Sequence, residues 1–172
     1  MPKYNESQIK LRIERVLQRY PTSTSQDVRQ RLMLTVKPSY LYSYFVPFYE
    51  SGRIDDRADI QRAIRAMMKE HLGFSVIAQK LASGRYNFLQ VEQALRLLQA
   101  EFDHVAQTKR CKVARFGSER PIDEHHQSQV VMYLQKKGHR LTDIWSVLRD
   151  ERFEFGTGAY SGNPHHQLGR LR

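Results

Sequence analysis

The sequence has little that would place it in a membrane or cross-link it covalently. Only one of its 172 residues is a cysteine, Cys111, so no intrachain disulfide can form and a reducing, intracellular compartment is favoured. No run approaches 18 consecutive apolar residues, which excludes a membrane-spanning helix. Residues 1–19 mix charged and apolar side chains without a continuous apolar stretch, so no secretory signal is expected. These absences predict a cytoplasmic protein.

The chain also lacks the residue groupings that catalysis or cofactor binding needs. Its two histidine pairs, at 125–126 and 165–166, are poor metal ligands because adjacent side chains on a helix point about 100° apart. Cys111 has basic neighbours but no histidine and acid at a recognisable spacing to make it a nucleophile. Asp55 and Asp56 are better explained as acids at a helix start. We therefore expect no enzyme activity, no metal and no cofactor.

Positive charge is the strongest compositional feature. The chain has 28 Lys and Arg against 18 Asp and Glu, a net charge of +10. The excess is spread along the sequence, from +4 in residues 1–51 to +1 in residues 151–172, with no basic tail. This pattern predicts that a folded surface meets a polyanionic partner, either nucleic acid or an acidic protein surface. The alternative is that the charge mainly provides solubility.

Apolar residues recur at helical spacing throughout, and no convincing alternating strand is present. Pro47 is expected to kink or interrupt a helix over residues 38–49, which Gly52 would follow as a C-cap. Residues 101–116 are expected to form one helix with Phe102, Val105 and Val113 in its apolar pattern. Residues 151–172 are rich in glycine and are expected to form a flexible tail.

The helices repeat three times. Leu32, Leu81 and Leu134 serve as anchors 49 and 53 residues apart, and each has an apolar residue four positions before it and ten and fourteen positions after it. Repeats of this length indicate units that stack to bury their apolar faces. The pattern predicts an all-α fold, an elongated and curved array of three tandem three-helix repeats. The expected boundaries are residues 1–51, 52–100 and 101–150, with the tail at 151–172.

The order of the motifs resembles the RecX family, regulators of the bacterial recombinase RecA. The family's glycine, apolar residue and paired acids between repeats one and two are matched by residues 52–56. Its glycine followed by an Ile-x-x-x-Leu step is matched by Gly73 and residues 77–81. Later matches are residues 112–117, then 134–139 followed by Asp143 and Ile144. The resemblance covers roughly residues 6–150 and rests on the order of these motifs rather than on any one of them.

The sequence departs from the family pattern at His139, Asp59, Arg85 and residues 36–38, so the resemblance is to a divergent member. It implies a monomeric regulator that binds in the groove of the RecA–DNA filament and inhibits RecA ATP hydrolysis, filament extension and strand exchange. Such a protein would act in recombination, DNA repair and the SOS response. The alternative is a helical repeat protein that binds single- or double-stranded DNA directly.

Candidate contact residues follow from charge and helical spacing. Cations three or four residues apart share an exposed helix face, and tyrosines among basic groups can stack on unpaired bases. In the aromatic segment, Tyr42, Phe45, Val46 and Tyr49 fit a buried face, which leaves Tyr40 and Tyr44 as exposed candidates. Each basic group is explained more simply as a solvated helix face that contacts no partner. The candidates are Arg12, Arg15, Arg19, Arg62, Arg65, Lys69, Lys109, Lys112, Arg115, Lys136, Lys137, Tyr40 and Tyr44.

Overall fold

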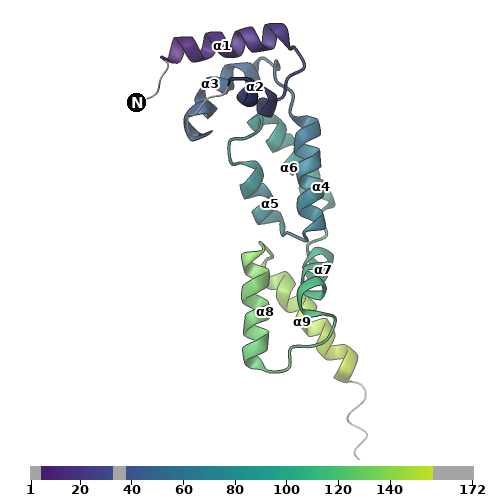
Figure 1. The fold of residues 1–172 in the computed structure, drawn as a ribbon. Helices are drawn as coiled ribbons and strands as arrows, with labels where there is room; N and C mark the ends of the chain where they lie inside the picture. Colours follow the sequence, from purple (N-terminus) through teal and green to yellow (C-terminus); the bar gives the residue numbers. More distant parts are fainter. Residues whose placement is uncertain (1–4, 33–37, 157–172) are drawn as a thin grey trace, which may run out of the picture.

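The computed structural model describes the backbone of residues 5–32 and 38–156 and the side chains of residues 5–32 and 42–149. Every regular element in this part of the chain is an α-helix, which confirms the expected all-α class. Figure 1 shows an elongated molecule, with α1 at one end and α8 and α9 at the other. The helices are α1 (Glu6–Arg19), α2 (Ser25–Leu32), α3 (Pro38–Glu50), α4 (Arg57–Lys69), α5 (Phe74–Leu81), α6 (Phe88–Glu101), α7 (His104–Phe116), α8 (Glu124–Lys136) and α9 (Leu141–Gly156).

Short polar side chains start several of these helices. The Asn5 side chain accepts a hydrogen bond from the backbone N–H of Ser7, and Gln8 completes a capping box. Asp103 and Asp123 cap α7 and α8 by accepting from the N–H groups three residues on. At each position the acceptor satisfies a donor that has no partner inside the helix.

Three separate groups of buried apolar side chains follow one another along the chain. The first core joins α1, α2 and α3, the second joins α4, α5 and α6, and the third joins α7, α8 and α9. Phe88, at the start of α6, packs partly against the first core, with its ring centroid 6.3 Å from that of Tyr49. The first and second cores therefore meet through aromatic contacts.

The second and third cores meet at a close backbone contact. The N–H of Gly73 donates to the carbonyl of Lys137 over 2.8 Å, and the Ser75 hydroxyl donates to the carbonyl of Gly138. A Cβ on Gly73 would lie 2.1 Å from the Gly138 carbonyl oxygen, inside any allowed contact. Gly138 itself has φ +92, a conformation that L side chains rarely adopt. The junction therefore requires glycine at both positions.

The helix α3 continues through Pro47 to Glu50 without interruption, because proline removes a donor without preventing helical φ there, and the kink stays a prediction. Two other expectations about helix limits are wrong. Residues 101–116 form the end of α6, a break at Phe102 and Asp103, and then α7. The helix α9 extends to Gly156 and so includes residues 151–156, the first six of the expected tail. Two other expectations concern residues outside the described ones. They are the departure from the family pattern at residues 36–37 and the flexible tail over residues 157–172.

The buried face of α7 is not the expected one. Val105 and Val113 are exposed, whereas Gln107, Thr108, Cys111 and Lys112 are buried. Phe102 packs into the second core beside Phe74 instead of belonging to α7. Polar groups occupy this buried face because each has a partner there. The Gln107 amide, for example, donates to the carbonyls of Met68 and Leu72.

Candidate functional site

The basic stripe predicted on α4 is exposed. Arg62, Arg65 and Lys69 all have exposed side chains. Arg62 forms an ion pair with Asp59, one turn earlier on the same helix. Asp59 is itself mostly covered, and its carboxylate holds Arg62. The stripe is available to a partner from the solvent side of α4.

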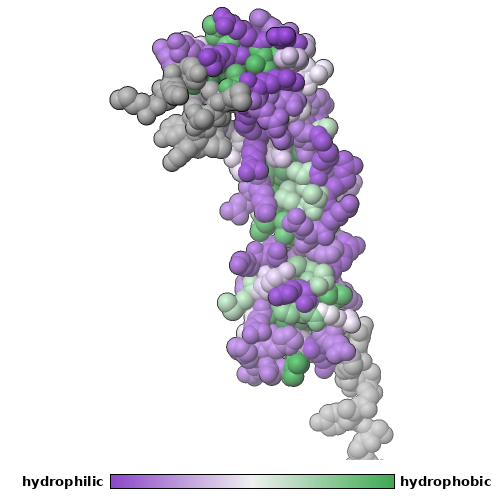
Figure 2. All heavy atoms as spheres, in the orientation of Figure 1, coloured by the Kyte–Doolittle hydropathy of each residue, from purple (hydrophilic) through white to green (hydrophobic). Residues whose placement is uncertain are grey.

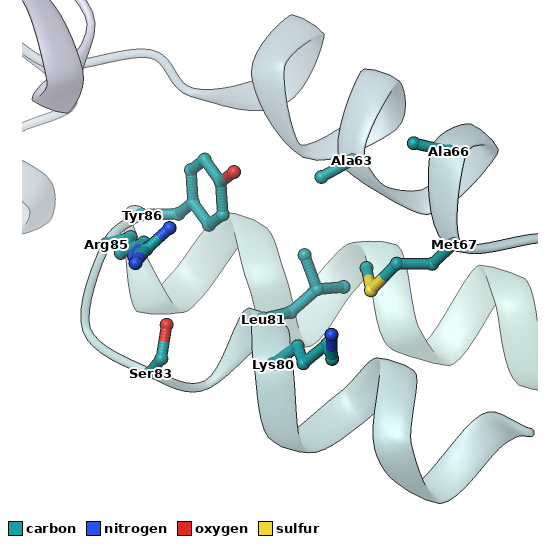
Figure 3. Close-up of a pocket in the computed structure, with 8 residues that line it drawn as sticks. All are labelled: Ala63, Ala66, Met67, Lys80, Leu81, Ser83, Arg85 and Tyr86. Carbon is teal, nitrogen blue, oxygen red and sulfur yellow. The ribbon is translucent and has the colours of Figure 1, made fainter. Parts of the chain in front are cut away.

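A cleft beside this stripe adds two cations that the sequence patterns missed. It has a volume of about 430 Å³ and lies between α4, α5 and the turn that joins α5 to α6 (Figure 3). Lys80 and Arg85 line it, and both are exposed. They lie 11 to 23 residues from the α4 cations in sequence, so no local spacing connects them. Only the packing of α5 against α4 reveals the shared surface.

An arginine from α2 holds the turn that forms one wall of this cleft. The Arg29 guanidinium donates two hydrogen bonds, to the carbonyl of Gly84 over 2.6 Å and to that of Arg85 over 2.5 Å. Its Cζ atom lies 5.0 Å from the ring centroid of Phe45. Tyr42 closes over Gly84, whose φ of +82 suits glycine. The first core thus fixes the position of Arg85.

The predicted cations of α1 lie far from those of α7 and α8. Arg15 and Arg19 are exposed on α1, while Arg12 is partly buried. The helix α1 lies at one end of the molecule, away from α7 and α8 (Figure 1). Arg19 and Arg31 both lie near the Tyr20 ring, at 5.6 and 3.9 Å from its centroid. This end of the molecule therefore carries its own basic patch.

Around the third core, predicted cations from two parts of the chain lie together, and one predicted cation is buried. Arg115 and Lys137 lie 5.9 and 5.6 Å from the centroid of the same Tyr133 ring. Lys109 and Lys136 are exposed. Lys112 is fully buried, and its Nζ atom donates to the carbonyl of Glu119 over 2.5 Å. The predicted contact at Lys112 needs an exposed side chain, whereas this one is buried and bonded within the protein.

The aromatic segment also exposes less ring surface to a partner than the sequence suggests. Phe45 and Tyr49 are buried, as expected. Tyr44 is half-buried and packs against the first core, so only part of its ring is available for stacking. The side chain of Tyr40 lies outside the described residues.

A buried carboxylate connects the first and second cores. Asp56 is fully buried and accepts hydrogen bonds from the N–H and hydroxyl of Ser25, at 2.7 and 2.5 Å, and from the N–H of Asn87 at 2.6 Å. Because the Ser25 hydroxyl gives its proton to Asp56, the Tyr49 hydroxyl donates to Ser25 in turn. Burial raises the pKa of Tyr49 to about 12, so it keeps that proton.

The paired acids therefore have different roles. Asp55 is exposed and pairs with Arg57, whose hydrogen bonds lower the pKa of Asp55 to about 2. Asp56 precedes α4 but forms no side-chain cap on it. The interpretation of both residues as simple helix-start acids is wrong for Asp56, which spans three helices that are distant in sequence.

Burial shifts the pKa values of two other titratable groups, Cys111 and His139. Burial raises the pKa of the Cys111 thiol, which disfavours the thiolate that a nucleophile requires. Burial also lowers the pKa of His139, whose Nε2 atom lies 2.8 Å from the carbonyl oxygen of His71. Its Nδ1 atom lies 3.0 Å from the Thr108 hydroxyl. The neutral ring donates from Nε2 and joins α7 to the α4–α5 connection.

The described part of the chain has no group of three or more His, Cys, Asp and Glu placed to hold a metal ion. None of the helices described is both long enough and apolar enough to cross a membrane. No protein-family model matches the sequence, and no curated protein matches it significantly.

Proposed function

We propose that this chain is a divergent RecX-type regulator that binds the RecA–DNA filament and restrains ATP hydrolysis, filament extension and strand exchange. The observation that carries the proposal is the order of motifs over residues 6–150 on a chain whose helices build three successive cores. An extended array with cations on several faces suits contact along a filament better than capture of a small molecule.

The repeat is part of the same proposal. Its anchor residues Leu32, Leu81 and Leu134 are buried at the ends of α2, α5 and α8, and the residues four positions earlier are buried beside them. The later positions of each repeat fall on α3, α6 and α9. These placements support three copies of one three-helix unit, stacked end to end in a curved array.

Within this proposal the α4 stripe and the neighbouring cleft form the principal contact surface. This surface combines Arg62, Arg65 and Lys69 with Lys80 and Arg85. It lies in the middle of the molecule, where a long partner would cross it. The α1 patch and the cations around Tyr133 would add contacts on either side.

The first test is a titration of the full chain into RecA on single-stranded DNA, with ATP hydrolysis as the readout. We expect inhibition at substoichiometric amounts, because one bound regulator would affect many filament subunits. Absence of inhibition together with tight binding to naked DNA would favour the direct DNA-binding alternative. For phosphate contacts, log affinity should fall by about 0.9 per contact for each log unit of salt.

The second test removes the α4 stripe by replacing Arg62, Arg65 and Lys69 with alanine. We expect weaker inhibition and a smaller salt dependence of filament binding. A matched control removes three exposed cations of described ion pairs outside α4, namely Lys10, Arg96 and Arg140, and so makes the same change in net charge. Equal behaviour of the two triple variants would remove α4 from the proposed surface.

A further inference from the structure

The cleft beside α4 combines an apolar floor with charged edges. Ala66 and Met67 of α4 and Leu81 of α5 face it, and Tyr86 closes one end (Figure 3). In the same region of Figure 2, apolar side chains gather between hydrophilic ones over α4 and α6. At about 430 Å³ the cleft is at the small end of the range for ligand sites, with room for a few side chains rather than a helix.

The charged residues that line the cleft itself are both cations. Lys80 and Arg85 lie at the edge, and none of the described residues that line the cleft is acidic. On α4, Ala66 lies between Arg62, four residues earlier, and Lys69, three residues later, so both cations flank the floor on the same helix face. Because Arg62 is paired with Asp59, an occupant meets apolar surface at the centre of the cleft and Lys80 and Arg85 at its edge.

We propose that this cleft binds a segment of a partner protein in which an aliphatic side chain lies beside a carboxylate. The aliphatic group packs on the exposed Ala66, above the buried Met67 and Leu81, and the carboxylate pairs with Lys80 or Arg85. A nucleic-acid backbone satisfies only the second requirement, because phosphates offer nothing apolar to the floor. Charge-assisted contacts at the rim of a desolvated apolar centre are also how protein interfaces combine specificity with affinity.

The wall of the cleft is fixed before the partner arrives. Arg29 holds the carbonyls of Gly84 and Arg85, so the backbone that carries the Arg85 side chain is braced against the first core. A preformed wall lowers the ordering cost of binding. The inference rests on the proposed function, since it assigns the partner chemistry at the same surface: RecA would supply a protein segment here, and DNA would be contacted elsewhere.

The test begins with the full chain immobilised and a phage-displayed library of random heptapeptides. We expect enrichment of sequences with Leu, Ile or Met next to Asp or Glu. A fluorescent peptide of the enriched sequence is then titrated by anisotropy, and Lys80→Glu with Arg85→Glu should weaken it at least tenfold. The matched control is Lys10→Glu with Arg96→Glu, also two exposed cations, which should change affinity less than twofold. Circular dichroism confirms that both variants are folded.

A second variant separates apolar anchoring from charge. Ala66→Leu fills the floor and leaves every cation in place; it should weaken the peptide at least fivefold and leave the affinity for a 30-nucleotide oligo(dT) unchanged. The inference is overturned if no acidic-apolar pattern is enriched, if the peptide binds the Lys80/Arg85 variant normally, or if oligo(dT) alone responds to that variant. If no such peptide binds at the cleft but the chain still inhibits RecA, only this inference is removed. Loss of inhibition with the peptide result intact supports the cleft and removes the proposed partner.

Discussion

Replacing Asp56 with alanine tests whether one buried carboxylate joins the first two cores. The change removes the acceptor for three donors, namely the N–H and hydroxyl of Ser25 and the N–H of Asn87, at a site with no solvent exposure. Each buried donor left without a partner costs about 1–3 kcal/mol. Because rotation of the serine hydroxyl relieves part of this cost, we expect a loss of about 3–5 kcal/mol in the free energy of unfolding.

Its neighbour provides a matched control. Asp55→Ala removes the same group one position away, but Asp55 is exposed and its ion pair with Arg57 is on the surface, so the loss should be about 0–1 kcal/mol. Asp56→Asn keeps the shape and turns one acceptor into a donor that faces an N–H. Its loss in the free energy of unfolding should lie between those of Asp56→Ala and Asp55→Ala, at about 2–3 kcal/mol.

Urea denaturation followed by far-UV circular dichroism measures these differences as shifts of the midpoint. The single tryptophan, Trp145, packs against the third core and gives a second signal from the far end of the molecule. We expect Asp56→Ala to shift the dichroism midpoint more than the fluorescence midpoint. Equal losses for Asp56→Ala and Asp55→Ala would refute the assignment of Asp56 as a connecting group.

The other predictions concern the two junctions and the buried lysine. Gly73→Ala should cost at least about 2–3 kcal/mol in urea unfolding because its Cβ meets backbone, whereas Gly52→Ala, with open space around it and φ +69, should cost about 1 kcal/mol. Arg29→Lys should lose about 1–2 kcal/mol by the same assay, because one ammonium cannot reproduce a two-carbonyl contact. The pKa of His139 is lower in the folded state than in the unfolded state, so its contribution to stability is full above about pH 6.5 and is lost as the pH falls; the pH dependence of unfolding between pH 7 and 5 should therefore flatten in His139→Phe. Lys112→Met should leave the salt dependence of RecA-filament binding unchanged, and a reduced slope would show that this side chain reaches the partner after all.

Helical periodicity predicted the parts of the fold that depend on local apolar spacing. Ile9, Ile13 and Leu17 are buried on α1, and Ile60 and Ile64 are buried on α4, as their spacing indicates. These residues have only to reach one core from one helix. For such helices the sequence pattern and the tertiary contacts agree, so the pattern was sufficient.

The helix α7 shows where this reasoning fails. Its apolar residues Val105 and Val113 suggested one face, but that face points to solvent. Gln107 and Thr108 are buried instead, because carbonyls at the end of α4 and the ring of His139 supply their hydrogen-bond partners. Those partners come from residues 31 to 39 positions away, so no local pattern contains them. Where a buried face is polar, hydrogen-bond partners rather than apolar residues decide which side of a helix turns inward.

The difference between local spacing and long-range packing also explains which site residues the sequence predicted. The α4 cations follow a spacing of three and four, which a sequence displays directly. Lys80 and Arg85 join them only because α5 packs on α4 and Arg29 holds the following turn. A binding surface assembled in this way depends on a contact from the neighbouring core. Loss of Arg29 should therefore disturb the cleft while leaving the α4 stripe in place, which separates the two halves of the surface experimentally.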